Sequence, residues 1–100
     1  MKDFSLSVLF DYYSEILSDK QKQIFDSYYN LDLSLSEIAE NTGITRQGVR
    51  DFIKRTEQLL REYEEKLGFA QKCDELKKLS ADIESNDPSV NKLKKLINNL

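Results

Sequence analysis

The feature that most constrains how this chain can fold is a pair of helix-start signals on the two sides of Gly43. Before it, the Ser34 hydroxyl can accept a hydrogen bond from the backbone N–H of Glu37, whose carboxylate can reach back to Ser34 in a capping box. After it, Thr45 supplies a second N-cap. Gly43 itself can adopt the positive φ that a sharp turn requires. The segment therefore predicts two helices joined by a tight turn.

The apolar residues around this turn have the spacing of a helix-turn-helix. A small residue, Ala39, lies inside the first helix where the second must cross it closely, and Gly43 follows four residues later. Ile44, Val49 and Phe52 are then placed to hold the two helices together. Because helical bundles that bind no DNA can show the same spacing, the pattern predicts the motif and leaves its use open.

The residues before this motif also follow a helical period. Apolar residues at i, i+3, i+4 and i+7 predict a helix that begins near Ser5. Ser18 and Gln21 then form another capping box, which predicts the start of a second helix. Glycine (3) and proline (1) are scarce, and this favours helices over strands. We therefore expect an all-α fold.

The second half of the chain extends this pattern. The helix that follows Thr45 meets no breaker before Gly68, so it should be long, about 22 residues. A further helix is expected over about 69–84, and a last one from Pro88, which favours a first helical position. The sequence thus predicts a helix-turn-helix DNA-binding domain over 1–68. A helical C-terminal extension over 69–100 would serve oligomerisation or packing.

The net charge of −3 is unusual for a DNA-binding protein, so the distribution of charge matters. Residues 1–44 carry a balance of −5, and residues 62–100 carry −1. Only residues 45–61 are net positive, with a balance of +3. A localised positive face can bind phosphate on an acidic molecule, with an affinity that depends strongly on salt.

The predicted second helix of the motif presents side chains suited to DNA. Arginine can pair with guanine, glutamine with adenine, and aspartate can accept from cytosine, whereas Thr45 and Lys54 are better placed to hold phosphates. The alternative is a solvated helix face without a ligand. Clustered cations at i, i+4 and i+8 in an otherwise acidic chain favour the first interpretation. The candidate DNA-binding residues are Thr45, Arg46, Gln47, Arg50, Asp51, Lys54 and Arg55.

The sequence argues against an enzyme, a cofactor and a metal centre. It has no histidine, a single cysteine, Cys73, and glycines only at 43, 48 and 68, which leaves neither a metal–thiolate cluster nor a phosphate loop. One cysteine cannot form an internal disulfide and fits a reducing compartment. No stretch reaches the ~20 apolar residues of a membrane span. We therefore expect a cytoplasmic protein that does not contact membranes.

The run from Phe10 to Phe69 resembles the YlxM family of helix-turn-helix proteins. The segments that carry the resemblance are DLSLSEIAE, TRQGV and KRTEQLLREYEEKL. The last third of the chain is similar to the family only in its long predicted helix and its lysine-rich end. The resemblance implies a helix-turn-helix bundle similar to region 4 of sigma factors and a role in binding double-stranded DNA. It also implies a link to the signal recognition particle pathway.

Two functional hypotheses follow. The first is a DNA-binding regulator that uses the basic helix face. The second is a protein-interaction accessory factor that contacts components of the signal recognition particle or its receptor and keeps the motif as a scaffold, without physiological DNA binding. The acidic N-terminal half favours the second hypothesis, and the basic helix favours the first.

The apolar stripes of the C-terminal third predict a homodimer. The long helix carries Ile53, Leu60 and Leu67 at seven-residue spacing, and the last two helices add two more stripes. A four-helix core cannot cover all of these, so we expect the C-terminal third to pair with a second copy. The alternative is that the last two helices bury the stripes within one monomer.

Overall fold

The computed structural model describes residues 2–100, and in that range the chain forms helices and no strands. This confirms the predicted all-α fold. The chain divides into two compact units, one ending at Leu67 and the other spanning Gly68–Leu100. The first unit contains α1 (Ser5–Tyr13), a short 3₁₀ turn (Ser14–Ile16), α2 (Asp19–Tyr29), α3 (Leu35–Thr42) and α4 (Arg46–Leu67), and the second contains α5 (Phe69–Ala81) and α6 (Pro88–Asn98).

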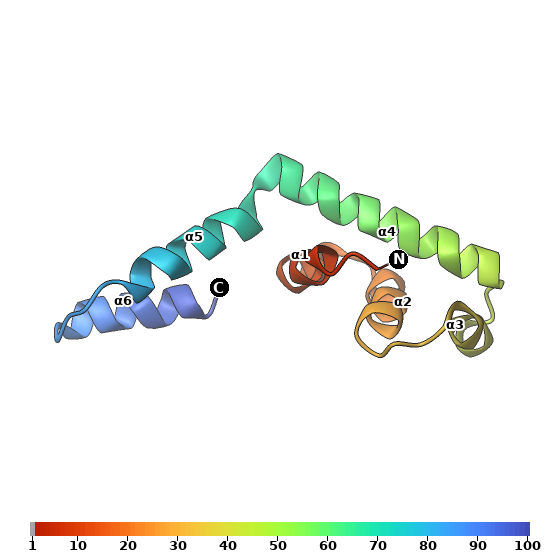
Figure 1. Ribbon diagram of the computed structural model, residues 1–100, viewed down its shortest axis with the longest axis horizontal. Helices are drawn as coiled ribbons and strands as arrows, with labels where there is room; N and C mark the ends of the chain where they lie inside the picture. The colour runs from red at the N-terminus through yellow and green to blue at the C-terminus, as the bar shows by residue number, and fades with distance from the viewer. Residues whose placement is uncertain (1) are drawn as a thin grey trace. The chain divides into compact units, whose positions relative to one another are not determined.

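Helix α4 is the longest element of the first unit, and α1, α2 and α3 all pack against one side of it (Figure 1). Within this core the Phe10 and Phe25 rings stack with centroids 4.7 Å apart, and Phe25 stacks on Tyr29 at 4.3 Å. The first of these contacts joins α1 to α2, the second lies within α2, and α4 closes the core from above in the view of Figure 1. The buried side chains of the unit are Leu6, Phe10, Tyr13, Leu17, Ile24, Phe25, Tyr29, Ile38, Val49, Ile53, Thr56 and Leu60.

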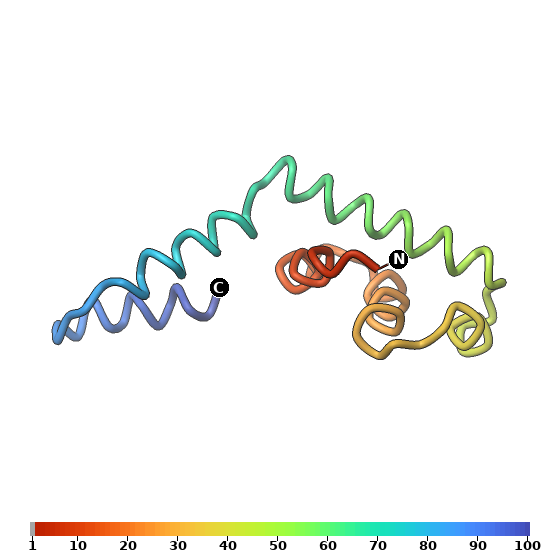
Figure 2. The backbone as a smooth tube through the Cα atoms, in the orientation of Figure 1, coloured from red at the N-terminus to blue at the C-terminus, as the bar shows by residue number. Residues whose placement is uncertain are grey.

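The helix starts predicted from capping chemistry are confirmed. Ser18 and Gln21 form a reciprocal capping box at α2, and Ser34 and Glu37 form another at α3. Helix α3 ends at Gly43, which has a left-handed φ of 73° and donates its N–H to the Ala39 carbonyl at 3.0 Å. The chain can therefore turn directly from α3 into α4, as the trace in Figure 2 shows.

One apolar residue of the first unit departs from the sequence pattern, and one aromatic residue follows it. Ile16 continues the apolar period that starts at Leu6, but it is 54% exposed. Helix α1 ends at Tyr13, and the chain turns into extended backbone at Leu17, which is buried instead. Tyr29, at core spacing in α2, is only 5% exposed. Its ring stacks on Phe25, and its hydroxyl finds a partner on α4.

The second unit is a helical hairpin in which α5 and α6 run antiparallel, side by side (Figure 2). Asp87 caps α6 by accepting a hydrogen bond from the Ser89 N–H at 2.9 Å, with Pro88 in the first helical position, as predicted. Helix α5 ends at Ala81, three residues before the expected boundary. The Lys94 Nζ donates to the Ile83 carbonyl at 2.6 Å, which ties α6 to the loop after α5. Among the described residues, no helix is long and apolar enough to cross a membrane.

Candidate nucleic-acid interface

The first turn of α4 is fixed by Thr45 and Gly48. The Gly48 N–H donates to the Thr45 Oγ1 at 3.0 Å, so Thr45 acts as the N-cap, as its position predicted. A Cβ added at Gly48 would lie 2.8 Å from the Ile44 Cγ2 and 3.0 Å from the Thr45 Oγ1. Glycine costs a helix interior up to ~1 kcal/mol relative to alanine. The close approach of Ile44 and Thr45 explains why a glycine fits this position.

Helical geometry divides α4 into a buried face and an exposed face. Because an α-helix turns about 100° per residue, the buried residues Val49, Ile53 and Leu60 define the inner face, and Gln47 and Asp51 lie opposite to it. The Gln47 amide donates to the Asp51 carboxylate at 3.0 Å, which joins these two side chains on the outermost part of the helix. The structure exposes all the predicted site residues, which are Thr45, Arg46, Gln47, Arg50, Asp51, Lys54 and Arg55.

Two adjoining clefts lie on the flank of α4 that faces α3. Leu35, at the start of α3, and Arg50 belong to both of them. The first cleft, of about 380 Å³, is completed by Arg46 and Gln47. The second, of about 200 Å³, is also lined by residues of α2 and α4, namely Tyr28, Ile53, Lys54 and Glu57. The three cations predicted at i, i+4 and i+8 therefore line one continuous side of the helix.

Arg55 lies on the other flank of α4. Its guanidinium carbon is 6.0 Å from the centroid of the Phe52 ring, at the edge of cation–π range. Together with Phe52, Leu59 and Gln21, it borders a separate cleft of about 380 Å³ next to the start of α2. The structure thus brings Arg46, Arg50 and Lys54 together and places Arg55 apart from them.

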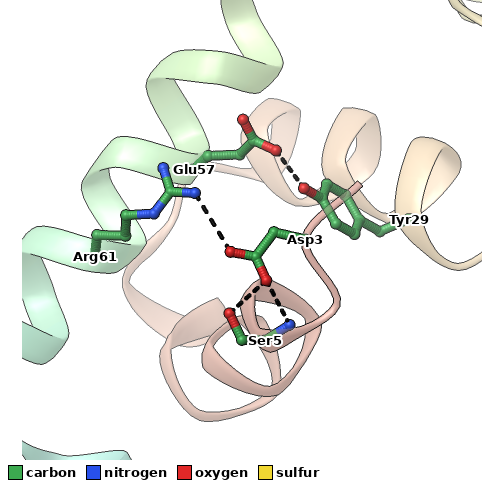
Figure 3. Close-up of polar contacts among 5 residues, drawn as sticks. All are labelled: Asp3, Ser5, Tyr29, Glu57 and Arg61. Atoms are coloured by element: carbon green, nitrogen blue, oxygen red, sulfur yellow. Dashed lines mark hydrogen bonds and ion pairs between the residues drawn. The ribbon is translucent and has the colours of Figure 1, made fainter. Parts of the chain in front are cut away.

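Two tyrosine–glutamate pairs hold α4 on the helices beneath it. The Tyr29 hydroxyl of α2 donates to the Glu57 carboxylate of α4, and the Tyr13 hydroxyl of α1 donates to Glu64. Figure 3 shows the first pair reaching from α2 to α4. The sequence pattern did not identify these pairs, because their members lie 28 and 51 residues apart along the chain. They fix the rotation of α4, and hence the direction in which its exposed face points.

The residues before α1 add a third tie to α4. Asp3 accepts hydrogen bonds from the Ser5 hydroxyl at 2.6 Å and the Ser5 N–H at 3.0 Å, and it lies 3.6 Å from the Arg61 guanidinium (Figure 3). These hydrogen bonds and the nearby Arg61 lower the pKa of Asp3 below its ordinary value. Lys2 donates to Asp32 at 2.6 Å and lies over the Tyr28 ring, 4.6 Å from its centroid. Lys2 therefore packs on a residue that lines the second cleft.

We expect Tyr29→Phe to lower the free energy of unfolding by about 1–2 kcal/mol, since the half-buried Glu57 carboxylate loses its donor. Burial, and then the hydrogen bond to Glu57, raise the pKa of Tyr29 above its ordinary value of 10.0. A raised folded-state pKa gives stability that is complete below pH ~10 and is lost as pH rises beyond it. Urea unfolding from pH 7 to 11 should show this alkaline loss in the parent and a smaller one in the variant. Equal loss in both would contradict the assignment.

Comparison with known proteins finds relatives that all belong to one family. The model of the UPF0122 family, described as "Putative helix-turn-helix protein, YlxM / p13 like", matches residues 1–100. A UPF0122 protein of Clostridium novyi is 51% identical over 71 residues, which are 71% of this chain and 62% of the relative. One from Listeria welshimeri is 46% identical over 80% of this chain and 73% of the relative. The chain spans less than two thirds of the length of the clostridial relative that it matches.

Proposed function

The chain belongs to the UPF0122 family of YlxM/p13-like helix-turn-helix proteins, and from this premise we propose that it binds double-stranded DNA as a regulator. Residues 1–68 would be the DNA-binding domain, and the first half of α4 would enter the major groove. The proposed contact residues are the N-cap and the exposed side chains in the first half of α4: Thr45, Arg46, Gln47, Arg50, Asp51, Lys54 and Arg55.

The observation that carries this proposal is the row of Arg46, Arg50 and Lys54. They are exposed, lie on successive turns of one rigid helix, and belong to the one net-positive segment of an acidic chain. A helix of this kind next to a tight turn fits the width of the major groove. Because few cations contribute, electrostatic attraction should give only modest affinity.

We expect the full chain to bind duplex DNA with an affinity that falls as a power of the salt concentration. Each phosphate that the protein neutralises contributes a slope of about −0.9 in a plot of log K against log salt. Fluorescence anisotropy with labelled duplexes between low and physiological salt measures this slope. A parent chain that binds no duplex at low salt would refute the proposal.

A second candidate function is an accessory role at the signal recognition particle or its receptor. The observation that favours it is the surface of the second unit, where seven large apolar side chains are at least 42% exposed. Exposed apolar groups of this density are typical of protein–protein contacts. Binding of the full chain to the assembled particle, together with no binding to duplex DNA, would favour this role. The seven exposed apolar residues of the second unit are Phe69, Leu76, Leu79, Ile83, Leu93, Leu96 and Leu100.

The same apolar residues support the proposal of a homodimer. Within the second unit, two helices provide no third layer to cover them, and a second hairpin would supply one. We expect sedimentation at micromolar concentration to give about twice the chain mass of 11.7 kDa. A dimer would present two α4 helices, ideally ~34 Å or a multiple apart, to a palindromic site. A species with the mass of one chain would contradict this proposal.

A further inference from the structure

We propose that α4 separates two tasks: the Gln47–Asp51 pair reads bases, and the cleft formed by Tyr28, Arg50 and Lys54 binds a phosphate of the DNA backbone. This inference rests on the DNA binding proposed above and assigns roles within it. It changes the expectation for Arg50, whose residue type alone suggested a guanine contact. It also adds to the interface a residue of α2, Tyr28, which lies outside the helix-turn-helix motif.

The direction of each side chain supports the division. Gln47 and Asp51 lie on the part of α4 farthest from the buried residues, so they would enter deepest into a groove. The hydrogen bond between them, at 3.0 Å, holds the amide and the carboxylate in one orientation. A glutamine can pair with adenine, and a carboxylate can accept from the amino group of cytosine. This pair therefore has the chemistry and the position for base recognition.

Arg50 points to the flank instead. It shares the first cleft with Gln47, but it also lines the second cleft, which contains Tyr28 and Lys54 and neither Gln47 nor Asp51. DNA that receives the outer face of α4 in its major groove must bring a backbone strand past each flank of the helix. A guanidinium on the flank meets phosphate oxygens, for which its planar fork of donors is well suited. Arg50 is thus placed to fix the register of the helix on the duplex.

The second cleft has the size and the donors for a phosphate group. Its volume is about 200 Å³, and Tyr28, Arg50 and Lys54 can each donate a hydrogen bond. Lys2 lies over the Tyr28 ring, 4.6 Å from its centroid, with its charge paired to Asp32, so the cations that face the phosphate are Arg50 and Lys54. The one carboxylate in the lining, Glu57, accepts from the Tyr29 hydroxyl. Its negative charge opposes phosphate binding, and the two positive charges of Arg50 and Lys54 outweigh it.

The experiment compares two classes of variant of the full chain. The phosphate class consists of Arg50→Ala, Lys54→Ala and Tyr28→Phe. The base-reading class consists of Gln47→Ala and Asp51→Ala. Base preference is measured by selection from duplexes with a randomised centre, and the salt slope by anisotropy on a fixed duplex. We expect Arg50→Ala and Lys54→Ala each to reduce the steepness of the salt slope by about 0.9 and to leave the base preference unchanged. Tyr28→Phe should weaken binding to all duplex sequences equally. Gln47→Ala and Asp51→Ala should relax the base preference and leave the salt slope unchanged.

The matched control is Lys66→Ala, which removes one positive charge from the same helix at an exposed position about 24 Å along the axis from Arg50. Its slope and preference should equal those of the parent. A parent that binds no duplex would refute DNA binding as a whole. A parent that binds, with an Arg50→Ala variant that loses base preference at an unchanged salt slope, would overturn the division of tasks alone.

Discussion

The double variant Arg46→Ala/Arg50→Ala is expected to bind duplex DNA roughly 10²- to 10⁴-fold more weakly than the parent. Each DNA-contacting arginine contributes about 1–3 kcal/mol, and two on one face lose most of the affinity together. Both side chains are exposed and lie outside the core, so the variant should unfold at the same urea concentration as the parent. Anisotropy at 0.1 M salt and urea unfolding measure the two quantities separately.

A change in net charge alone could also weaken binding, so the control must remove the same charge elsewhere. Lys20→Ala/Lys66→Ala does this at two exposed positions of the first unit, one at the start of α2 and one at the end of α4. We expect this control to stay within a few-fold of the parent, because distant charges are screened beyond about 10 Å at 0.1 M salt. Parent-like binding by the double arginine variant would show that α4 is not the recognition helix.

The fold of the first unit could be predicted because its signals are local. Capping at Ser18 and Ser34 depends on a partner three residues away, and the turn depends on a single glycine. Such interactions are visible in the sequence without knowledge of the tertiary structure. The length of α4, 22 residues, followed from the absence of a breaker before Gly68.

The orientation of α4 could not be predicted in the same way. It depends on Tyr29 meeting Glu57 and on Tyr13 meeting Glu64, pairs that only the packed helices bring together. For the same reason the periodicity identified which residues of α4 are exposed but did not distinguish its two flanks. Arg50 and Arg55 differ because α3 lies on one side of α4 and the start of α2 on the other.

The second unit shows another limit of pattern reading. The apolar stripes of α5 and α6 predicted helices, and helices are found there. A stripe alone does not specify what covers it, and in α5 the buried positions are Ala70, Cys73 and Ser80, beside Leu76 and Leu79, which are 44% and 67% exposed. Two short helices have too little surface to bury residues on more than one face of each.

The second large effect is expected at the turn of the motif, where Gly43→Val should lower the free energy of unfolding by about 2–3 kcal/mol. Gly43 has a φ of 73°, a conformation that a β-branched residue adopts only under strain, and strained positions cost about 1–3 kcal/mol each. A Cβ at this position would have no atom within 4 Å. The Cβ itself therefore meets no neighbour, and we expect backbone strain to be the main cause of the effect.

Gly43→Asn is the control that separates backbone strain from side-chain volume. Asparagine is larger than alanine but tolerates the left-handed region, so it should cost clearly less than valine if strain is the cause. If side-chain volume were the cause, asparagine and valine would be similarly destabilising. The turn also sets how α4 leaves α3, and relief of the strain by the valine variant would change that angle. DNA affinity measured well below the unfolding transition should then fall in Gly43→Val and stay close to the parent in Gly43→Asn. Equal urea midpoints for valine and parent would show that the turn is not strained by a β-branched residue.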